Sequence, residues 1–569
     1  MTDKVIVTNI SALKQKYDEK GIKDLQAAIK ALIDADKKRG LTTSLIALDD
    51  PQQMSKLKSA VVKDAGSYPE NKEAIDGVYK ALVPDYLMIL GAIDVIPHQD
   101  LKNPLFSSDP DADTDKVAWG DLPYACDAPY SKNIKDFTGP TRVVGRLPDI
   151  TGQGDSRYLV GLLKTASAWR GRPKSDYAKC LGISAEKWQE STAESLTNIF
   201  GADTGLHNSP TEGFKWSKGL INLRSHFINC HGGDVFSFFL GQAGDDDDNM
   251  PESHSAAFVG GKGKILEGTV LSAECCYGGQ LYDPSAEDSN QMGMCNTYLD
   301  QKAYGYFGST TIAYGPFSGN DQADLICQFF LQRVLAGASL GRAALEARQR
   351  FIERCSPLSP INRKTLAQFN LYGDPSITPV DVAMAKAVAS KGGSKVFAKG
   401  LMGATALQEA GAVERADRRA TLRAKGEVLK ELQPRMSETK AGPPKSVEAS
   451  LKTYMNRLKF TPLPNPVSYK VQSTVTPTIG VKSAMSMGIT KAVKEKKKQT
   501  TGFHIMFGKP KDGTVTKSMS TAKGIGKRGK AKGVAGATPF KPARIKKFVA
   551  LEAKEVDGKI VSITEAHSK

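Results

Sequence analysis

The hydrophobic pattern of the first part of the chain alternates between strand-like and helix-like segments. An apolar strand pattern at residues 5–7 is followed by an amphipathic helical pattern at 15–38 and a second strand pattern at 42–48. A strand, a helix and a strand at this spacing favour neighbouring parallel strands. The nearly unbroken apolar run at 86–97 is typical of a strand buried on both faces of a sheet.

The same alternation continues to about residue 380. The further strand patterns lie at 142–148, 223–230, 268–275 and 303–310, and helical patterns at 156–168 and 321–355 separate several of them. We therefore predict an α/β fold, an α/β/α sandwich built on a mostly parallel sheet. No internal repeat of a fixed period is visible.

The composition changes after residue 380. Residues 383–433 are rich in Ala, Lys, Glu and Arg, which favours helices with a polar surface, and prolines then mark a linker. Strand patterns return near the end, where Asp557-Gly558 is a strong hairpin signal. We predict two α/β subdomains at 1–150 and 151–380, a helical connector at 381–460 and a small basic, β-containing C-terminal domain at 461–569.

Length and composition indicate a globular protein with more than one folded unit. The chain has 569 residues, of which 40% are hydrophobic and 24% charged. No stretch reaches the roughly 18 apolar residues that span a bilayer. The first residues also lack the apolar core and cleavage site of a signal peptide. These features predict a cytoplasmic protein that does not bind a membrane.

The formal net charge of the chain is +17, and nearly all of the excess lies in one segment. Residues 491–547 contain 17 Lys and Arg side chains and only two acidic ones, a net charge of +15. Such a segment is a candidate binding site for nucleic acid or another polyanion. Its few aromatic residues disfavour a platform for stacked bases, and a solvated, flexible basic linker is the alternative.

Two of the predicted strands end in reactive residues. The pattern at 223–230 leads into His231-Gly232-Gly233, and the pattern at 268–275 leads into Cys276 and two further glycines. The carboxyl ends of parallel strands share one edge of a sheet, so His231 and Cys276 are predicted to meet there. An imidazole beside a thiol generates a nucleophilic thiolate. The backbone N–H groups of Gly232 and Cys276 are the predicted oxyanion donors, since glycine lets the backbone approach a substrate closely.

These motifs resemble the caspase-like clan of cysteine peptidases, in which His-Gly follows one strand and the nucleophilic Cys follows the next. His231 precedes Cys276 by 45 residues, comparable with about 50 in caspases. Four further segments are similar to the gingipain family and occur in that family's order: LGAIDVIP at 90–97, GRLPDIT at 145–151, YGYFGST at 304–310 and LYGDPSITP at 371–379.

The resemblance covers roughly residues 1–380 and none of the basic tail. It implies a caspase-like sandwich with two related sub-sheets and a cysteine endopeptidase that uses His231 and Cys276. It implies no organic cofactor and no metal. Gingipains are secreted, whereas this chain shows no export signal, so the location and biological role of the family do not carry over.

Two assignments come from aligning this chain with the family. Aligning Glu274-Cys275-Cys276 with the Glu-Ala-Cys of the clan selects Cys276, and adjacent strand residues face opposite sides, so only one of the two cysteines can face His231. The segment CDAPY at 126–130 resembles the gingipain stretch with an Asp in the P1 pocket of arginine-specific members. That match makes Asp127 a candidate substrate-binding residue and implies cleavage after Lys or Arg.

Several alternatives concern the same residues or their neighbours. A zinc site formed by Cys230, His231, Cys275 and Cys276 lacks the usual paired CxxC spacing. His226 and His254 are alternative bases without a glycine context. The acidic run at 245–248 is a candidate calcium loop or, more simply, a solvated loop.

Two other functional interpretations also stay open. In one, the chain is a non-catalytic caspase-fold scaffold that binds nucleic acid or another polyanion through its basic C-terminal region. In the other, it is a regulated protease that is latent until a regulatory protein partner moves a loop. A protease that cleaves protein substrates after Lys or Arg could also take its own basic tail as a substrate or pseudosubstrate.

Overall fold

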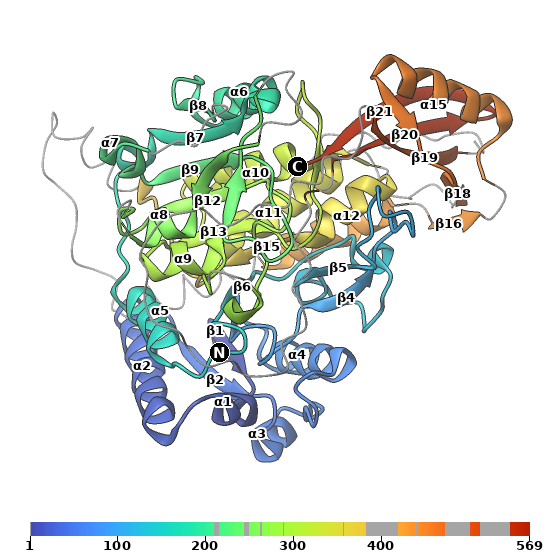
Figure 1. Cartoon of the computed structure of the whole chain (residues 1–569). Helices are drawn as coiled ribbons and strands as arrows, with labels where there is room; N and C mark the ends of the chain where they lie inside the picture. Colours follow the sequence, from blue (N-terminus) through green and yellow to red (C-terminus); the bar gives the residue numbers. More distant parts are fainter. Residues whose placement is uncertain are drawn as a thin grey trace, which may run out of the picture.

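The structure, a computed structural model, describes residues 2–209, 216–243, 250–261, 264–287, 290–356, 358–382, 419–433, 435–439, 442–472, 501–511, 545 and 547–569. Two sheets dominate it, a central sheet of ten strands and a seven-stranded sheet formed mainly by the end of the chain (Figure 1). The acidic run at 245–248 and most of the basic segment at 491–547 lie outside the described residues.

The central sheet is parallel within each of its halves. Its strands, in spatial order, are β2 (Thr43–Ala47), β1 (Lys4–Thr8), β3 (Tyr86–Leu90), β6 (Val144–Leu147), β15 (Phe369–Tyr372), β13 (Gly305–Ser309), β12 (Val270–Ala273), β9 (Ser225–Asn229), β7 (Cys180–Ala185) and β8 (Leu206–Ser209). Only the pair β15 and β13 is antiparallel. The two halves therefore form one continuous sheet, and β9 and β12 end at the same edge.

Helices cover both faces of this sheet. They are α1 (Ile10–Lys16), α2 (Glu19–Lys38), α3 (Pro51–Lys56), α4 (Tyr68–Leu82), α5 (Arg157–Ala168), α6 (Gln189–Phe200), α7 (Lys218–Ile221), α8 (Ala256–Gly260), α9 (Met294–Asp300), α10 (Gln322–Leu335), α11 (Leu340–Arg354) and α12 (Pro360–Gln368). Adjacent residues of β13 show the two layers, because Tyr306 packs on Tyr298 of α9 while Phe307 stacks on Phe330 of α10. The predicted α/β sandwich with a mostly parallel sheet is thus confirmed.

Some predicted elements are divided where the backbone requires it. The helical pattern at 15–38 forms two helices, because Asp18 caps the N-terminus of α2 through its side chain. The apolar run at 86–97 leaves the sheet after Leu90, at Gly91 with φ +120°. Gly337, with φ +89°, separates α10 from α11 within the helical pattern at 321–355.

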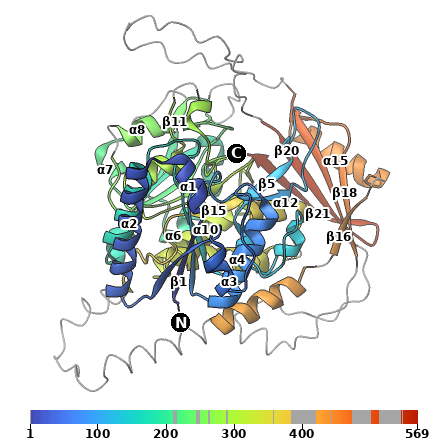
Figure 2. The ribbon, with the colours of Figure 1, turned by 90° about the horizontal axis from the view of Figure 1, so that it is seen from below.

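The C-terminal residues form a second sheet, which also includes a short strand from the segment that follows β13. It contains β14 (Tyr314–Gly315), β21 (Lys559–Ser568), β20 (Val549–Val556), β19 (Thr501–Pro510), β18 (Val467–Gln472) and β16 (Arg435–Thr439), with β17 (Phe460–Pro462) paired to β19. Helix α15 (Lys445–Arg457) packs its apolar side on β19 and β20. The predicted hairpin turn at Asp557-Gly558 is confirmed between β20 and β21. Strand β21 runs from this sheet toward the middle of the molecule, where the chain ends (Figures 1 and 2).

None of the helices that the structure describes has the length and apolar character needed to cross a membrane.

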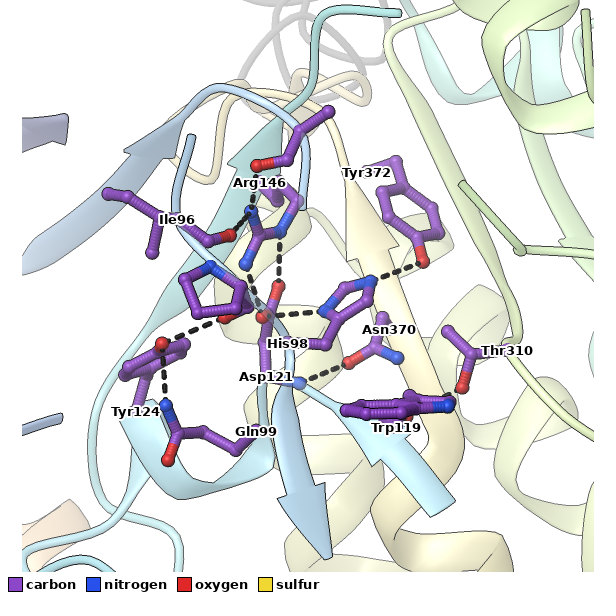
Figure 3. Close-up of polar contacts among 12 residues, drawn as sticks. Ile96, His98, Gln99, Trp119, Asp121, Tyr124, Arg146, Thr310, Asn370 and Tyr372 are labelled. Carbon is purple, nitrogen blue, oxygen red and sulfur yellow. Dashed lines mark hydrogen bonds and ion pairs between the residues drawn. The ribbon is translucent and has the colours of Figure 1, made fainter. Parts of the chain in front are cut away.

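A buried polar network ties the two halves of the central sheet to the loops above it (Figure 3). Arg146 of β6 donates two hydrogen bonds to Asp121, of 2.9 and 2.6 Å. His98 Nδ1 lies 2.9 Å from the same carboxylate, and its Nε2 lies 3.3 Å from the hydroxyl of Tyr372 on β15. That hydroxyl also donates to the carbonyl of Gly279, three residues after Cys276. The network therefore positions the loop that carries the candidate nucleophile.

We expect Asp121→Asn to lower the free energy of unfolding by about 3 to 5 kcal/mol, because it leaves the buried Arg146 without an anion. Burial raises the pKa of Asp121, but Arg146 and His98 outweigh it and hold that pKa below its usual range. This stabilisation is present above the ordinary Asp pKa of about 3.9 and is lost as the pH falls below it. Urea unfolding from pH 7 to pH 3 measures both effects.

The matched control is Asp155→Asn, because Asp155 pairs with Arg157 at the exposed start of α5. This variant should unfold like the wild-type protein. Equal unfolding free energies for the two variants at pH 7 would contradict a structural role for the buried network.

Candidate active site

Strands β9 and β12 bring the predicted site residues to one edge of the sheet. The strands pair in parallel, with Ile228 opposite Ala273, and the amide of Glu274 donates to the carbonyl of Ile228 at 2.9 Å. A Cβ atom added to Gly232 would lie 1.9 Å from the carbonyl oxygen of Cys276. Only glycine fits at this distance, so the segment containing His231 and Gly232 lies directly against the peptide of Cys276.

The thiol of Cys276 is buried beneath the segment that follows β13. Its Sγ accepts a hydrogen bond from the amide of Ala313 at 3.3 Å. The next residue, Tyr277, has a left-handed backbone with φ 53°, which turns the chain sharply after the cysteine. Burial raises the pKa of Cys276 to about 12, so its resting form is the thiol.

Cys275 lies on the other side of the strand. It is fully buried, and its Sγ points toward the carbonyl of Ile228 at 3.8 Å. Burial, and then the neighbouring Cys230, raise its pKa well above the usual value. Of the two cysteines, Cys276 therefore lies against the segment that follows β13, and Cys275 lies against β9.

The ring of His231 is held by two neighbours. Its Nε2 lies 2.7 Å from Oε1 of Gln242, and the ring of Trp188 packs edge-on against it at 4.5 Å between centroids. Backbone hydrogen bonds of 2.9 Å in both directions with Leu240 fix the main chain of His231.

The last strand of the chain lies beside Cys276. Ser568 and His567 pair in antiparallel fashion with Tyr314 and Gly315 of β14. The amide of Lys569 donates to the carbonyl of Ala313 at 3.1 Å. The amide of Cys276 donates to the main-chain oxygen of Lys569 at 3.2 Å. An extended peptide that adds a strand to a sheet edge makes contacts of this kind.

The side chain of Lys569 enters a buried acidic pocket. Its ammonium donates to Asn229 Oδ1 at 2.9 Å, to Asp324 Oδ1 at 2.9 Å and to Glu274 Oε2 at 2.5 Å. The ammonium also lies 5.6 Å from the centre of the Trp188 ring. Lys569 and its three hydrogen-bond partners are each at most 1% exposed. We call Asn229, Glu274 and Asp324 the acidic pocket.

Electrostatics in the acidic pocket favour a bound cation. Burial lowers the pKa of Lys569, but the charges of Asp324 and Glu274 outweigh it, so that pKa is raised and the side chain stays protonated. Burial, and then the charge of Asp324, raise the pKa of Glu274 well above its usual value. An ammonium between the two carboxylates relieves their repulsion.

The residues of the acidic pocket were not predicted from the sequence. Asn229 and Glu274 stand two residues before His231 and Cys276, so the period of two along a strand was a usable signal for both. Asp324 comes from the first turn of α10, and Lys569 comes from the end of the chain. No pattern near the strand ends points to either of them.

Two acidic residues accept hydrogen bonds from the segments on either side of Cys276. Asp115 accepts hydrogen bonds from the Tyr277 hydroxyl at 2.6 Å and from the amide of Ile312 at 2.9 Å. Asp113 accepts from the Tyr314 hydroxyl at 2.7 Å. Together they hold the turn after Cys276 and the segment that pairs with the last strand.

Asp127, the predicted P1 residue, is engaged elsewhere. Its carboxylate accepts hydrogen bonds of 3.1 and 2.8 Å from the guanidinium of Arg142, which also pairs with Asp76. The structure brings Asp127 to none of the pocket residues by a hydrogen bond or ion pair. Its role in substrate binding stays a prediction from the resemblance.

The alternative bases lie on the side of α9. His226 and His254 are both buried and lie 3.0 and 2.7 Å from the hydroxyl of Tyr298. Burial lowers their pKa values to about 4 and about 3, so both rings are neutral. Within the described residues, no group of three or more His, Cys, Asp or Glu side chains is arranged to hold a metal ion.

Comparisons with known proteins do not identify a family for this chain. No known family and no curated protein matches this chain. Solved structures do match, among them one described as "Structure of Protease", with 13% sequence identity and a TM-score of 0.42. The match covers 66% of this chain and 78% of that one. A likeness this remote carries no argument about the fold or the activity of this protein.

Proposed function

We propose that this protein is a cysteine endopeptidase of the caspase-like, gingipain-like kind that cleaves protein substrates after Lys or Arg. Cys276 is the nucleophile, His231 the acid and base, and the amides of Gly232 and Cys276 the oxyanion donors. Neither an organic cofactor nor a metal takes part in the proposed reaction.

One observation carries this proposal: the amide of Cys276 donates to the main-chain oxygen of Lys569 at 3.2 Å. A scissile carbonyl must place its oxygen on such a donor, within reach of the nucleophile on the same residue. The antiparallel pairing of Ser568 with Tyr314 supplies the backbone contacts that a peptide substrate needs. The acidic pocket then receives the side chain that precedes the cut.

The chemistry needs only the residues already described. A nitrogen of His231 takes the proton of the Cys276 thiol, and the sulfur attacks the carbonyl carbon while the carbonyl electrons move to the oxygen. The intermediate collapses, the C–N bond breaks, and the leaving amine takes the proton from His231. Water then attacks the thioester carbon with His231 as its base, the C–S bond breaks to release the carboxylic acid product, and the proton on His231 returns to the sulfur.

The cysteine content supports a reducing compartment. All eight cysteines are free thiols. Proteins of oxidising compartments usually pair them, so we propose that the protein works in the cytoplasm.

Peptides that differ only at P1 test this function. The wild-type protein should cleave after Lys or Arg and not after Asp or Leu, because the acidic pocket pairs only with a cation. Mass spectrometry of the products identifies the cut. Preferred cleavage after Asp or a hydrophobic residue would contradict the proposal, as would no cleavage by both the wild-type protein and the Lys569→Ala variant.

A further inference from the structure

We propose that Lys569 and the strand leading to it are a resident ligand of this site, and that the acidic pocket is a lysine site that discriminates against arginine. The last strand must then leave before a substrate enters, and the substrate carries lysine at the site of cleavage. Both proposals rest on the proposed function, because they assume that a peptide substrate takes the place of Lys569. Whether the last strand occupies the site can be measured without any turnover.

Lys569 makes several independent contacts at once. Lys569 contributes its amide to Ala313, its main-chain oxygen to Cys276 and its ammonium to the acidic pocket. The ring of His567, two residues earlier, stacks on Phe317 at 3.6 Å between centroids. A strand that merely passed the site would not satisfy backbone and side-chain partners at the same time.

The acidic pocket would be unfavourable without a cation. Asn229, Glu274 and Asp324 are fully buried while Lys569 is in place, and without its ammonium two carboxylic groups would lie side by side with no cation between them. A buried lysine is equally unfavourable without anions. The acidic pocket and the buried ammonium therefore stabilise each other. A lysine of the substrate can replace Lys569 when the last strand leaves.

The geometry of the acidic pocket matches an ammonium group better than a guanidinium group. The three acceptor oxygens converge on a single nitrogen at 2.5 to 2.9 Å, which matches the three N–H donors of an ammonium. A guanidinium spreads five donors over three nitrogens in one plane. The acidic pocket would leave several of those donors buried and unsatisfied, so it should favour lysine over arginine.

The arrangement predicts an enzyme that its own last strand inhibits competitively. The last strand is tethered through the hairpin of β20 and β21, so its effective concentration at the site is high, on the order of millimolar for short connections. A substrate must compete with it. While it is bound, Cys276 is only 4% exposed.

Alkylation of Cys276 by iodoacetamide tests occupancy directly. We compare the folded wild-type protein with Lys569→Ala, with Lys569→Met, which keeps the length of the side chain, and with Lys559→Ala as the control. Lys559 is an exposed lysine at the start of the same strand. The two Lys569 variants should react at least about tenfold faster at Cys276, because the thiol becomes exposed and its pKa falls, whereas the control should match the wild type. Peptide mapping by mass spectrometry locates the label.

A peptide with the sequence of residues 565–569 tests the pocket. Added to Lys569→Ala, it should restore protection of Cys276, and a version ending in arginine should require at least about tenfold more peptide. Equal protection by both peptides would overturn the lysine preference. Unchanged alkylation in both folded Lys569 variants would overturn the resident ligand. Faster alkylation without hydrolysis of any lysyl peptide would uphold the resident ligand and contradict the proposed function instead.

Discussion

Replacing Cys276 with alanine is expected to abolish peptide hydrolysis, with a fall in kcat of about 10⁴-fold or more, as for other enzymes that lose their nucleophile. The oxyanion donors and the acidic pocket remain in this variant, so substrate binding should survive. Steady-state kinetics on a lysyl peptide measure the loss. A lysyl peptide electrophile should label the wild-type protein and leave the variant unlabelled.

Cys275→Ala is the matched control, because it removes the same atoms one residue earlier. Cys275 lies against the carbonyl of Ile228, on the opposite side of the strand from the last strand of the chain. This variant should keep its activity within a few-fold, although the cavity left in the core lowers its stability. Loss of activity in Cys275→Ala with retention in Cys276→Ala would reverse the assignment of the nucleophile.

The second large effect is expected from the acidic pocket. Asp324→Asn removes a charge that is fully buried and lies 2.9 Å from the bound ammonium. Because the same charge also holds Lys569, the change is made in the Lys569→Ala protein, in which that ammonium no longer competes with the substrate. There, losing one partner of a buried charge pair costs about 2 to 5 kcal/mol, which corresponds to a fall of roughly 30-fold to 5,000-fold in kcat/KM for a lysyl peptide. Hydrolysis of the matching norleucyl peptide should change little, so the ratio of the two rates measures the charge alone.

Glu274→Gln should lower the same rate ratio. It removes the carboxylate whose Oε2 lies 2.5 Å from the ammonium of Lys569. Asp300→Asn, at the exposed end of α9 on the other face of the sheet, is the control and should leave the rate ratio unchanged. An unaltered ratio in Asp324→Asn would show that the pocket does not select the P1 residue.

Regular local patterns account for the parts of the fold that were predicted correctly. Apolar runs bounded by turn residues located most of the strands, and the Asp557-Gly558 turn located the hairpin, because each signal acts within a few residues. Boundaries were less accurate. Gly91 and Gly337 end elements through their positive φ angles, and a pattern of hydrophobic residues does not reveal those angles.

The sequence by itself determined the alternation of strands and helices up to about residue 380, the placement of a histidine and a cysteine after two strand ends, and the position of glycine beside Cys276. These are consequences of short-range geometry, since parallel strands present their carboxyl ends at one edge. Only the tertiary structure decided what fills that edge. Asp324, from a helix, and Lys569, which lies 295 residues after Glu274, meet in the acidic pocket because buried charges require partners, and neither partner is marked by its neighbours in the chain.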